Sequence, residues 1–226
     1  MIRFENVSKI YPGDFVALES INLDIQQGDF VSIIGPSGSG KSTLLKLVYV
    51  EEQPTTGTVF FNDRPLDSIK TKHLPYFRRN IGTVFQDFKL LPQKTAYENV
   101  AYALEVSDGS VEEIKEIVPE ILDLVGMSDK MEKYPRQLSG GEQQKVCLAR
   151  ALVRKPLVII ADEPTGNLDP NSTLEIMQLL LKINSMGTTV LLASHNKNII
   201  DKINRRVVEL NNGRVVRDNI KSKYNV

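Results

Sequence analysis

Three short, largely apolar runs stand out in the pattern of hydrophobic and polar positions along the chain. They cover residues 31–34, 157–161 and 190–193. Runs of this kind are typical of central strands in a parallel sheet that is covered on both faces. Segments with helical character lie between the runs, so the pattern predicts an α/β fold.

Other parts of the chain predict antiparallel strands. Residues near 1–30 and 56–65 have the character of short strands joined by turns. Close to the end of the chain, two apolar-rich segments flank Asn-Asn-Gly, and residues 207–217 therefore predict a β-hairpin. We expect residues 221–226 to form a frayed tail.

Residues from about 95 to 153 have a mostly helical pattern. Ser110 and Glu113 match a capping box in front of an apolar helical face, and Gly126 is a suitable stop for that helix. Pro119 lies inside the same pattern and predicts either a kink or a break into two helices.

Composition and charge narrow the classes of protein. The chain has 226 residues, 41% of them hydrophobic, with 28 basic and 28 acidic side chains. A formal net charge of zero does not favour a nucleic-acid binder that relies on global charge. A single cysteine, Cys147, excludes an internal disulfide. We find no apolar stretch of about 18 residues and no signal peptide, and expect a cytoplasmic protein.

The segment from Gly35 to Thr43 carries the first candidate chemistry. It fits the pattern G-x-x-x-x-G-K-[ST] between an apolar strand and a helical run. Glycines let main-chain N–H groups turn toward phosphate oxygens, and the following helix directs its positive end at the same anion. We expect Lys41 to reach the β- and γ-phosphates and Ser42 to hold Mg²⁺. The alternative is a glycine- and serine-rich surface turn. The expected phosphate-binding residues are Gly35, Pro36, Ser37, Gly38, Ser39, Gly40, Lys41, Ser42 and Thr43.

The apolar run at 157–161 ends in two carboxylates, Asp162 and Glu163. A buried parallel strand delivers such groups to the carboxyl edge of the sheet, where ligands of α/β proteins bind. We expect Asp162 to support Mg²⁺ through a water molecule and Glu163 to polarise the attacking water. The alternative is a solvated acidic turn.

A third element is the start of a helix near Ser139. Ser139 and Glu142 match a capping box, so the helix is expected to begin at Ser139. Gly140 and Gly141 are poor helix formers in its first turn. They suit a place where the main chain approaches another molecule closely, as a γ-phosphate requires. An ordinary helix start softened by glycine is the alternative.

Together these elements resemble an ATP-binding cassette (ABC) ATPase over about residues 2–217. The resemblance implies a P-loop NTPase fold with a RecA-like parallel sheet core, an N-terminal antiparallel β subdomain and an α-helical subdomain. Residues 1–226 are then one nucleotide-binding domain, with the helical subdomain inserted at about 93–153. The motifs that carry the resemblance are residues 35–43, Gln86, residues 138–144, Asp162-Glu163, residues 166–169 and His195.

The resemblance also implies roles for single residues. Tyr11 would stack on adenine, and Gln86 would contact Mg²⁺ and sense the γ-phosphate. His195 would hydrogen-bond the γ-phosphate and orient Glu163. Each has a simpler alternative, because Tyr11 can be a packed or surface ring, Gln86 a polar strand end and His195 a structural histidine. His73 lies in a charged region, and we expect it to be solvated.

Residues on the third element would act on a second copy of the chain. Ser139 and Gly141 would contact the ATP bound by the opposite subunit, and Asp169 with its loop would communicate across that interface. The implied unit is a head-to-tail homodimer that closes on two ATP molecules with Mg²⁺. Lys145 stands where many members of the family carry arginine, and Cys147 where alanine is common. Both lie past the expected nucleotide contacts.

A cassette without a membrane span passes its motion to another protein. The resemblance implies that an integral membrane protein docks near the segment from Gln86 to Ala101. The apolar side chains of this segment either pack in the core or contact the membrane partner. We expect Phe88, Leu90 and Leu91 to divide about evenly between these two roles. The chain would then lie peripherally on the inner face of the cell membrane.

Residues 44–57, 85–92, 95–101 and 212–218 resemble the ATPases of cell-division complexes, whose membrane partners activate cell-wall hydrolases. ATPases of lipoprotein-release or macrolide-efflux transporters are the alternative. Cassettes that act on DNA or ribosomes usually carry coiled-coil insertions or a second cassette, and the sequence predicts neither, so no nucleic-acid partner is expected. A nucleotide-gated binding module without turnover is a further alternative, against which the presence of Glu163 and His195 argues.

Overall fold

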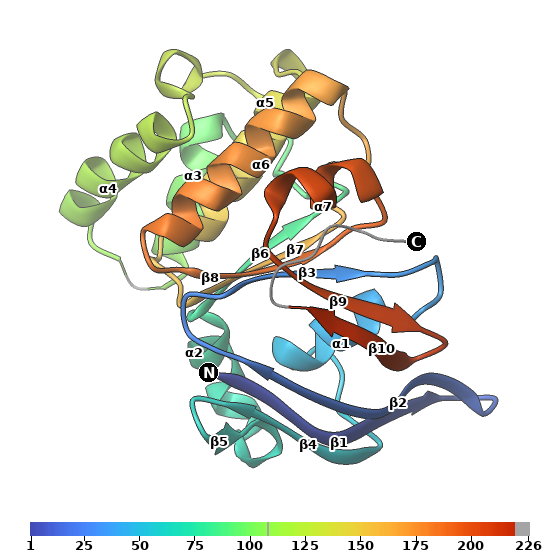
Figure 1. Cartoon of the computed structure of the whole chain (residues 1–226). Coiled ribbons are helices and arrows are strands. Elements are labelled where there is room, and N and C mark those ends of the chain that lie inside the picture. The colour runs from blue at the N-terminus through green and yellow to red at the C-terminus, as the bar shows by residue number, and fades with distance from the viewer. Residues whose placement is uncertain (108, 220–226) are drawn as a thin grey trace. The chain divides into compact units, whose positions relative to one another are not determined.

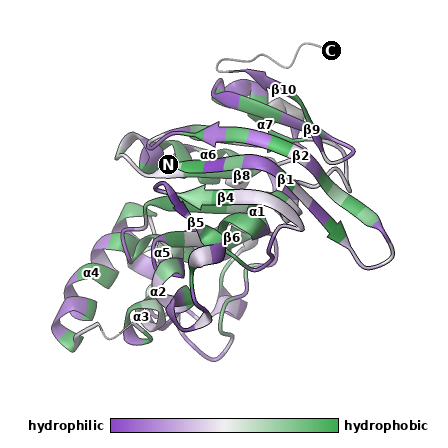
Figure 2. Cartoon of the chain, turned by 90° about the horizontal axis from the view of Figure 1, so that it is seen from below, coloured by the Kyte–Doolittle hydropathy of each residue, from purple (hydrophilic) through white to green (hydrophobic). Residues whose placement is uncertain are grey.

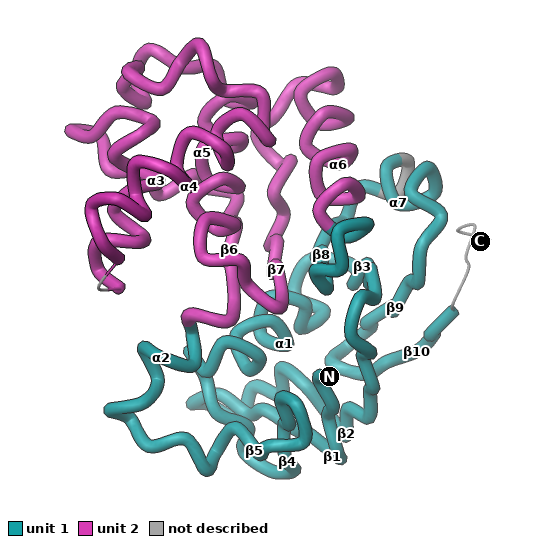
Figure 3. Tube along the Cα trace, turned by 90° about the vertical axis from the view of Figure 1, so that its left-hand side faces the viewer, with its two compact units in different colours: residues 1–78, 184–226 teal, residues 79–183 magenta. Residues whose placement is uncertain are grey.

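The structure is a computed structural model that describes residues 1–107 and 109–219. The chain divides into two compact units, Met1–Arg78 with Asn184–Val226, and Arg79–Ile183 (Figure 3). The expected helical subdomain at about 93–153 falls inside the second unit, and its boundaries remain a prediction. The expected tail at 221–226 lies outside the described residues.

The first unit contains most of the strands (Figure 1). Its elements are β1 (Ile2–Tyr11), β2 (Phe15–Ile25), β3 (Phe30–Ile34), α1 (Lys41–Val48), β4 (Thr56–Phe61), β5 (Arg64–Pro65), the 3₁₀ turns Leu66–Ser68 and Thr71–His73, α2 (Leu74–Arg78), β8 (Thr189–Ala193), α7 (Lys197–Ile203), β9 (Arg206–Asn211) and β10 (Arg214–Asn219).

The antiparallel sheet of this unit has the strand order β2-β1-β4-β5. Side chains alternate along β2, where Ile21, Leu23 and Ile25 are buried and the residues between them are exposed. Hydrophobic and hydrophilic residues also alternate along the ribbon in Figure 2. The expectation of short strands near 1–30 is wrong for β1 and β2, which have 10 and 11 residues. Shifts in their pairing register let both strands continue through polar positions such as Lys9.

The structure confirms that two of the three apolar runs form parallel strands in the first unit. All five residues of β3 and all five of β8 are buried, and β3 pairs in parallel with β8 on one side and β9 on the other. The expected hairpin is confirmed, since β10 pairs antiparallel with β9 around a turn in which Asn212 and Gly213 have positive φ. Helix α1 buries Leu44, Leu45 and Val48 and contacts β2, β4 and β8.

The second unit is mainly helical around two strands. Its elements are β6 (Ile81–Phe85), α3 (Ala96–Glu105), α4 (Val111–Leu124), the 3₁₀ turns Ser128–Lys130 and Pro135–Gln137, α5 (Gly140–Leu152), β7 (Val158–Asp162) and α6 (Pro170–Ser185), whose last two residues belong to the first unit. Strands β6 and β7 pair in parallel, and α5 contacts β6, α3 and α4. The third apolar run is therefore also a buried parallel strand.

Helix α4 confirms the predicted N-cap and the predicted stop. Ser110 caps it, because the Ser110 side chain accepts a hydrogen bond from the N–H of Glu113. The helix ends before Gly126, which has φ 71°. A break at Pro119 is wrong, since α4 continues through this residue as one helix. Val118 and Leu122 are fully buried, and this packing stabilises the helix across the missing N–H of Pro119.

Within the described residues, no helix is both long and apolar enough to cross a membrane.

Candidate nucleotide-binding site

The phosphate loop lies in the first unit between β3 and α1. Two of its glycines are required by the space around them. A Cβ on Gly35, which has φ 149°, would lie 2.1 Å from the carbonyl oxygen of Leu210. A Cβ on Gly40, which has φ 104°, would lie 2.5 Å from the carbonyl oxygen of Ala17. The path of the loop therefore depends on residues without side chains at both positions.

Lys41 begins helix α1 and turns its side chain back toward the loop. The side chain is buried, and its Nζ donates to the carbonyl oxygens of Gly35 at 2.8 Å and Pro36 at 3.0 Å. Gly40 is the N-cap and provides no side-chain hydrogen bond to the first turn of the helix. An ammonium group and helical N–H groups thus meet at one loop, and both favour an anion. Ser42 follows on the exposed side of the same turn.

His195 lies at the same sheet edge as the loop. Ile33 of β3 pairs with Ala193 of β8, so the residues after both strands emerge side by side. The N–H of Ser194 also donates to the carbonyl oxygen of Ile33 at 3.1 Å. His195 is exposed. The structure therefore brings His195 and the phosphate loop together within the first unit, as expected for a shared ligand at the carboxyl edge of parallel strands.

Tyr11 ends strand β1 at the hairpin to β2. It pairs with Phe15, and its half-buried ring is covered by the ammonium group of Lys9 at 5.0 Å from the ring centroid. Two residues beyond Phe15, Ala17 contacts Gly40 of the loop. The hairpin is thus joined to the phosphate loop, while the contact of Tyr11 with adenine remains a prediction.

Gln86, Asp162 and Glu163 lie together in the second unit. Phe85 pairs with Asp162 where β6 and β7 end, so Gln86 and Glu163 follow a directly paired position. Gln86 is exposed, and both carboxylates are half-buried. Glu163 has φ 49°, a left-handed conformation that is uncommon for a residue with a side chain.

Asn167 is a polar contact of this group that the sequence reasoning did not single out. The Nε2 of Gln86 donates to Oδ1 of Asn167 at 3.1 Å. A Cβ on Gly166 would lie 2.8 Å from the same Nε2, so Gly166 lets the loop pass directly over Gln86. The Gly-Asn-Leu-Asp pattern at 166–169 was a signal for this loop, but the pattern does not reveal which partner Asn167 has.

The expected capping box at Ser139 is confirmed. The Ser139 side chain accepts from the N–H of Glu142 at 3.3 Å, and the Glu142 carboxylate accepts from the N–H of Ser139 at 2.8 Å. Lys130 forms an ion pair with Glu142. The hydrogen bond from Lys130, followed by that from the Ser139 main chain, lowers the pKa of Glu142, and the same pair raises the pKa of Lys130.

Gly141 is needed inside the chain itself. A Cβ on Gly141 would lie 2.5 Å from Oγ of Ser172, at the start of α6. The interpretation of this glycine solely as a point of approach for another molecule is therefore incomplete, because internal packing already requires it. Asp169 begins α6 by accepting from the N–H groups of Asn171 and Ser172, both at 3.0 Å. The hydrogen bond with the Ser172 side chain is the main cause of the lowered pKa of Asp169.

The two departures from the family pattern have structural partners. Lys145 forms an ion pair with Glu175 at 2.6 Å. Cys147 is buried as expected for a small apolar side chain, and its Sγ donates to the carbonyl oxygen of Phe88 at 2.8 Å. Burial raises the pKa of the Cys147 thiol to about 12. Phe88, Leu90 and Leu91 are all half-buried, and His73 is exposed as predicted.

Comparison with known proteins identifies the class. The family model described as ABC transporter matches residues 18–166. The ATP-binding cassette MJ0796, solved as a dimer in a post-hydrolysis state bound to ADP and Pi, is 39% identical with a TM-score of 0.87, covering 97% of this chain and 98% of that one. CbiO1 from Clostridium perfringens, part of the ABC transporter complex CbiONQ, is 31% identical with a TM-score of 0.90, covering 97% and 88%.

Two similar relatives share a more particular name. The cell division ATP-binding protein FtsE of Bacillus subtilis is 50% identical over 224 residues, which is 99% of this chain and 98% of the relative. FtsE of Escherichia coli is 45% identical over 213 residues, covering 94% and 96%.

The chain therefore belongs to the ABC transporter family, and it is an ABC-type ATPase. The expected P-loop NTPase fold of the ABC type is confirmed. The residues of the first unit fit the phosphates of ATP, because the buried ammonium group of Lys41 and the glycine loop both suit an anion. Ser42 in this unit and Asp162 in the second unit each carry an oxygen that suits Mg²⁺.

Proposed function

We propose that this chain is the ATP-hydrolysing subunit of a cell-division complex of the FtsEX type. In this complex, ATP-driven closure of the dimer acts through an FtsX-like membrane protein to activate cell-wall hydrolases. The observation that carries the proposal is 50% identity to FtsE over nearly the whole of both chains. This similarity favours the cell-division complex over a lipoprotein-release or macrolide-efflux transporter.

The first unit supplies the binding half of the chemistry. Residues 35–43 hold the phosphates, with Lys41 on the β- and γ-phosphates and Tyr11 against the adenine ring. Ser42 of this unit, together with Gln86 and Asp162 of the second unit, would hold Mg²⁺, Asp162 through a water molecule. The ion would supply positive charge that neutralises the phosphates. The loop geometry around Gly35 and Gly40 and the inward-facing Lys41 support this assignment.

Hydrolysis is an in-line attack of water on the γ-phosphate. Glu163 polarises this water, Gln86 senses the γ-phosphate, and His195 hydrogen-bonds that phosphate and orients Glu163. Gln86 and Glu163 directly follow parallel strands, and His195 lies two residues beyond β8. These positions support the assignment, because strand ends hold functional groups on rigid elements.

A second copy of the chain completes each site. Ser139 and Gly141 of that copy contact the ATP, and the loop with Asp169 communicates across the interface. ATP binding closes the homodimer, and hydrolysis reopens it. The dimeric state of MJ0796 with ADP and Pi supports this arrangement.

The membrane partner docks on the segment from Gln86 to Ala101. Half-buried Phe88, Leu90 and Leu91 support a docking role, because each leaves apolar surface accessible. Docking there places the chain peripherally on the inner face of the cell membrane and connects the partner to a residue that senses the γ-phosphate.

Affinity capture from native membranes tests the identity of the complex. The full chain with an affinity tag, extracted in mild detergent, is expected to retain a membrane protein with four helices and one large extracytoplasmic loop. Recovery of only a substrate-transport permease would overturn the cell-division proposal. Double substitution of Leu90→Asp and Leu91→Asp is expected to abolish capture while ATP binding is retained.

A further inference from the structure

Gln144 lies on α5, five residues after Ser139, and is completely buried. Its side-chain Nε2 donates two hydrogen bonds, to the carbonyl oxygen of Phe85 at 3.2 Å and to that of Pro164 at 2.7 Å. The orientation of the amide follows from these partners, since a flipped amide would set an acceptor against two acceptors.

The two carbonyl groups flank residues with proposed roles in hydrolysis. Phe85 directly precedes Gln86, and Pro164 directly follows Glu163. The pairing of β6 with β7 ends at Phe85 and Asp162. The amide of Gln144 therefore joins the two chain segments just where the main-chain ladder stops, and it connects both to the helix that carries Ser139.

This junction bears on the conformation of Glu163. A residue with a side chain at φ 49° is in a strained conformation, and such a conformation persists when surrounding contacts hold it. Two hydrogen bonds hold the main chain at Glu163 and Pro164. The N–H of Gly166 donates to the carbonyl oxygen of Glu163 at 3.1 Å, and Gln144 donates to that of Pro164.

We propose that Gln144 is a positioning residue for hydrolysis, whose side-chain amide holds the main chain just before Gln86 and just after Glu163 and links both to the helix begun by Ser139. Gln144 touches no nucleotide in this role. The inference rests on the proposed role of Glu163, and it predicts that losing the amide donors slows hydrolysis while nucleotide binding is preserved.

Gln144→Met in the full chain is the first test, because methionine keeps the length of the side chain and lacks both donors. We expect kcat to fall about tenfold or more, since small displacements of a catalytic group have effects of this size. The KM for ATP and the affinity for a fluorescent ATP analogue should change by less than about twofold. An unchanged kcat would overturn the proposal.

Gln144→Glu supplies a second readout that a purely structural role would not move. A buried carboxylate facing two carbonyl oxygens has a raised pKa, and only its protonated form donates a hydrogen bond. The kcat of Gln144→Glu relative to wild type should therefore rise as the pH falls from about 8 to about 6. A pH-independent ratio would contradict the proposal, and this result can be obtained even if Gln144→Met fails to fold.

Arg150→Met is the matched control on the same helix. Its guanidinium donates to the carbonyl oxygens of Phe88 and Lys89, so the substitution also removes ties between α5 and the segment after β6 but leaves Pro164 untouched. We expect its kcat to stay within about twofold of wild type. An equal loss in Arg150→Met and Gln144→Met would mean that loosening α5 is sufficient, and the proposal would be rejected.

A double-mutant cycle separates this inference from the proposed function. If Gln144 acts through Glu163, adding Gln144→Met to Glu163→Gln should not lower the single-turnover rate further. Multiplicative losses would overturn the inference. If Glu163→Gln alone hydrolyses ATP at the wild-type rate, the proposed role of Glu163 fails. If Glu163→Gln hydrolyses ATP slowly but Gln144→Met hydrolyses it at the wild-type rate, the inference fails and the proposed function stands.

Discussion

The ammonium group of Lys41 donates a 2.8 Å hydrogen bond to the carbonyl oxygen of Gly35, the residue at which the phosphate loop begins. A second bond to Pro36 holds the same group at 3.0 Å. The loop is thus folded around the ammonium group of Lys41. The same side chain therefore helps to fix the path of the loop and supplies its positive charge. Loss of the Lys41 side chain is therefore expected to disturb the path of the loop as well as to remove its charge.

Lys41→Ala is expected to lower ATP affinity by about a hundredfold or more, because it removes a buried charge from an anion site. Titration with a fluorescent ATP analogue measures the effect. Lys46→Ala on the same helix is the control, since Lys46 forms a surface ion pair with Glu51 at 3.3 Å and should leave affinity unchanged. Equal affinity of Lys41→Ala and wild type would contradict the phosphate-loop assignment.

Glu163→Gln is expected to bind ATP but to hydrolyse it very slowly, because an amide cannot accept a proton from the attacking water. With Mg²⁺-ATP the variant should therefore accumulate as a closed dimer. Size-exclusion chromatography with light scattering measures the dimer, and release of phosphate measures turnover. Glu163→Asp is a useful comparison, since it keeps the charge but shortens the reach. Wild-type turnover in Glu163→Gln would remove Glu163 from the catalytic role.

Two glycines of the phosphate loop should differ in the stability that they confer. Gly40→Ala places a Cβ 2.5 Å from the carbonyl oxygen of Ala17 and is expected to lower the free energy of unfolding by about 2 kcal/mol or more. Gly38 has φ 78° and no atom within 4 Å of a Cβ, so Gly38→Ala should cost only about 1 kcal/mol. Urea unfolding without nucleotide measures both. Equal costs would mean that the contact with Ala17 is unimportant.

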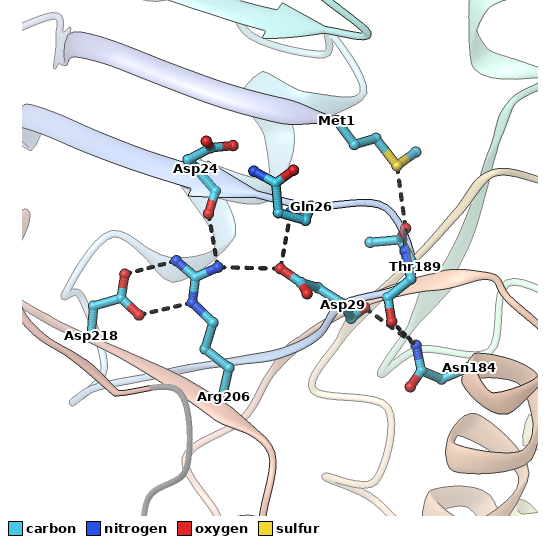
Figure 4. Close-up of polar contacts among 9 residues, drawn as sticks. Met1, Asp24, Gln26, Asp29, Asn184, Thr189, Arg206 and Asp218 are labelled. Carbon is cyan, nitrogen blue, oxygen red and sulfur yellow. Dashed lines mark hydrogen bonds and ion pairs between the residues drawn. The ribbon is translucent and has the colours of Figure 1, made fainter.

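Arg206 joins three segments of the first unit (Figure 4). It makes a two-point ion pair with Asp218, both bonds 2.8 Å long, and its Nη1 donates to the carbonyl oxygen of Asp24 at 2.8 Å and to Oδ2 of Asp29 at 3.2 Å. Its side chain is only 17% exposed, and the hydrogen bond with Asp218 is the main cause of its raised pKa. The guanidinium thus connects β9 with β10, with the end of β2 and with the turn before β3.

Arg206→Met is expected to lower the free energy of unfolding by about 2 kcal/mol, because four hydrogen bonds of a largely buried charge are lost. Arg214→Met removes the ion pair with Glu19, in which the arginine side chain is 64% exposed, and should destabilise the fold less than Arg206→Met, because solvent screens an exposed pair. Thermal or urea unfolding compares the two. A larger loss for Arg214→Met would refute this ranking.

The Glu142–Lys130 pair predicts a pH dependence of stability. The pKa of Glu142 is lowered below 4.5 in the folded chain, so its ionised form contributes stability above the unfolded value of 4.5. This contribution is lost as the pH falls below 4.5 through the lower folded pKa. The difference in unfolding free energy between wild type and Glu142→Gln should therefore be constant at neutral pH and shrink in acid. Lys130→Met should move the acid transition upward, because it removes the main cause of the shift.

Local signals in the sequence were sufficient for much of the fold. The apolar runs predicted β3, β7 and β8, since burial on both faces excludes polar residues from such strands. Ser139 with Glu142 predicted the start of α5, because a capping box acts within four residues. Of the two outcomes predicted for Pro119, a kink or a break, the break does not occur, since the packing of Val118 and Leu122 keeps α4 continuous.

The candidate site likewise has features that the sequence predicts and features that only the tertiary structure determines. Short stretches of sequence were sufficient to predict the phosphate loop before α1, the two carboxylates at the end of β7 and the histidine after β8, because each motif follows directly from the strand or helix beside it. Contacts between distant segments are not contained there. Gln144 bonds to Phe85 59 positions away, and Gly141 packs against Ser172. Such contacts arise only when folded elements meet, because hydrogen-bond geometry and steric exclusion act through space and leave no periodic trace along the chain.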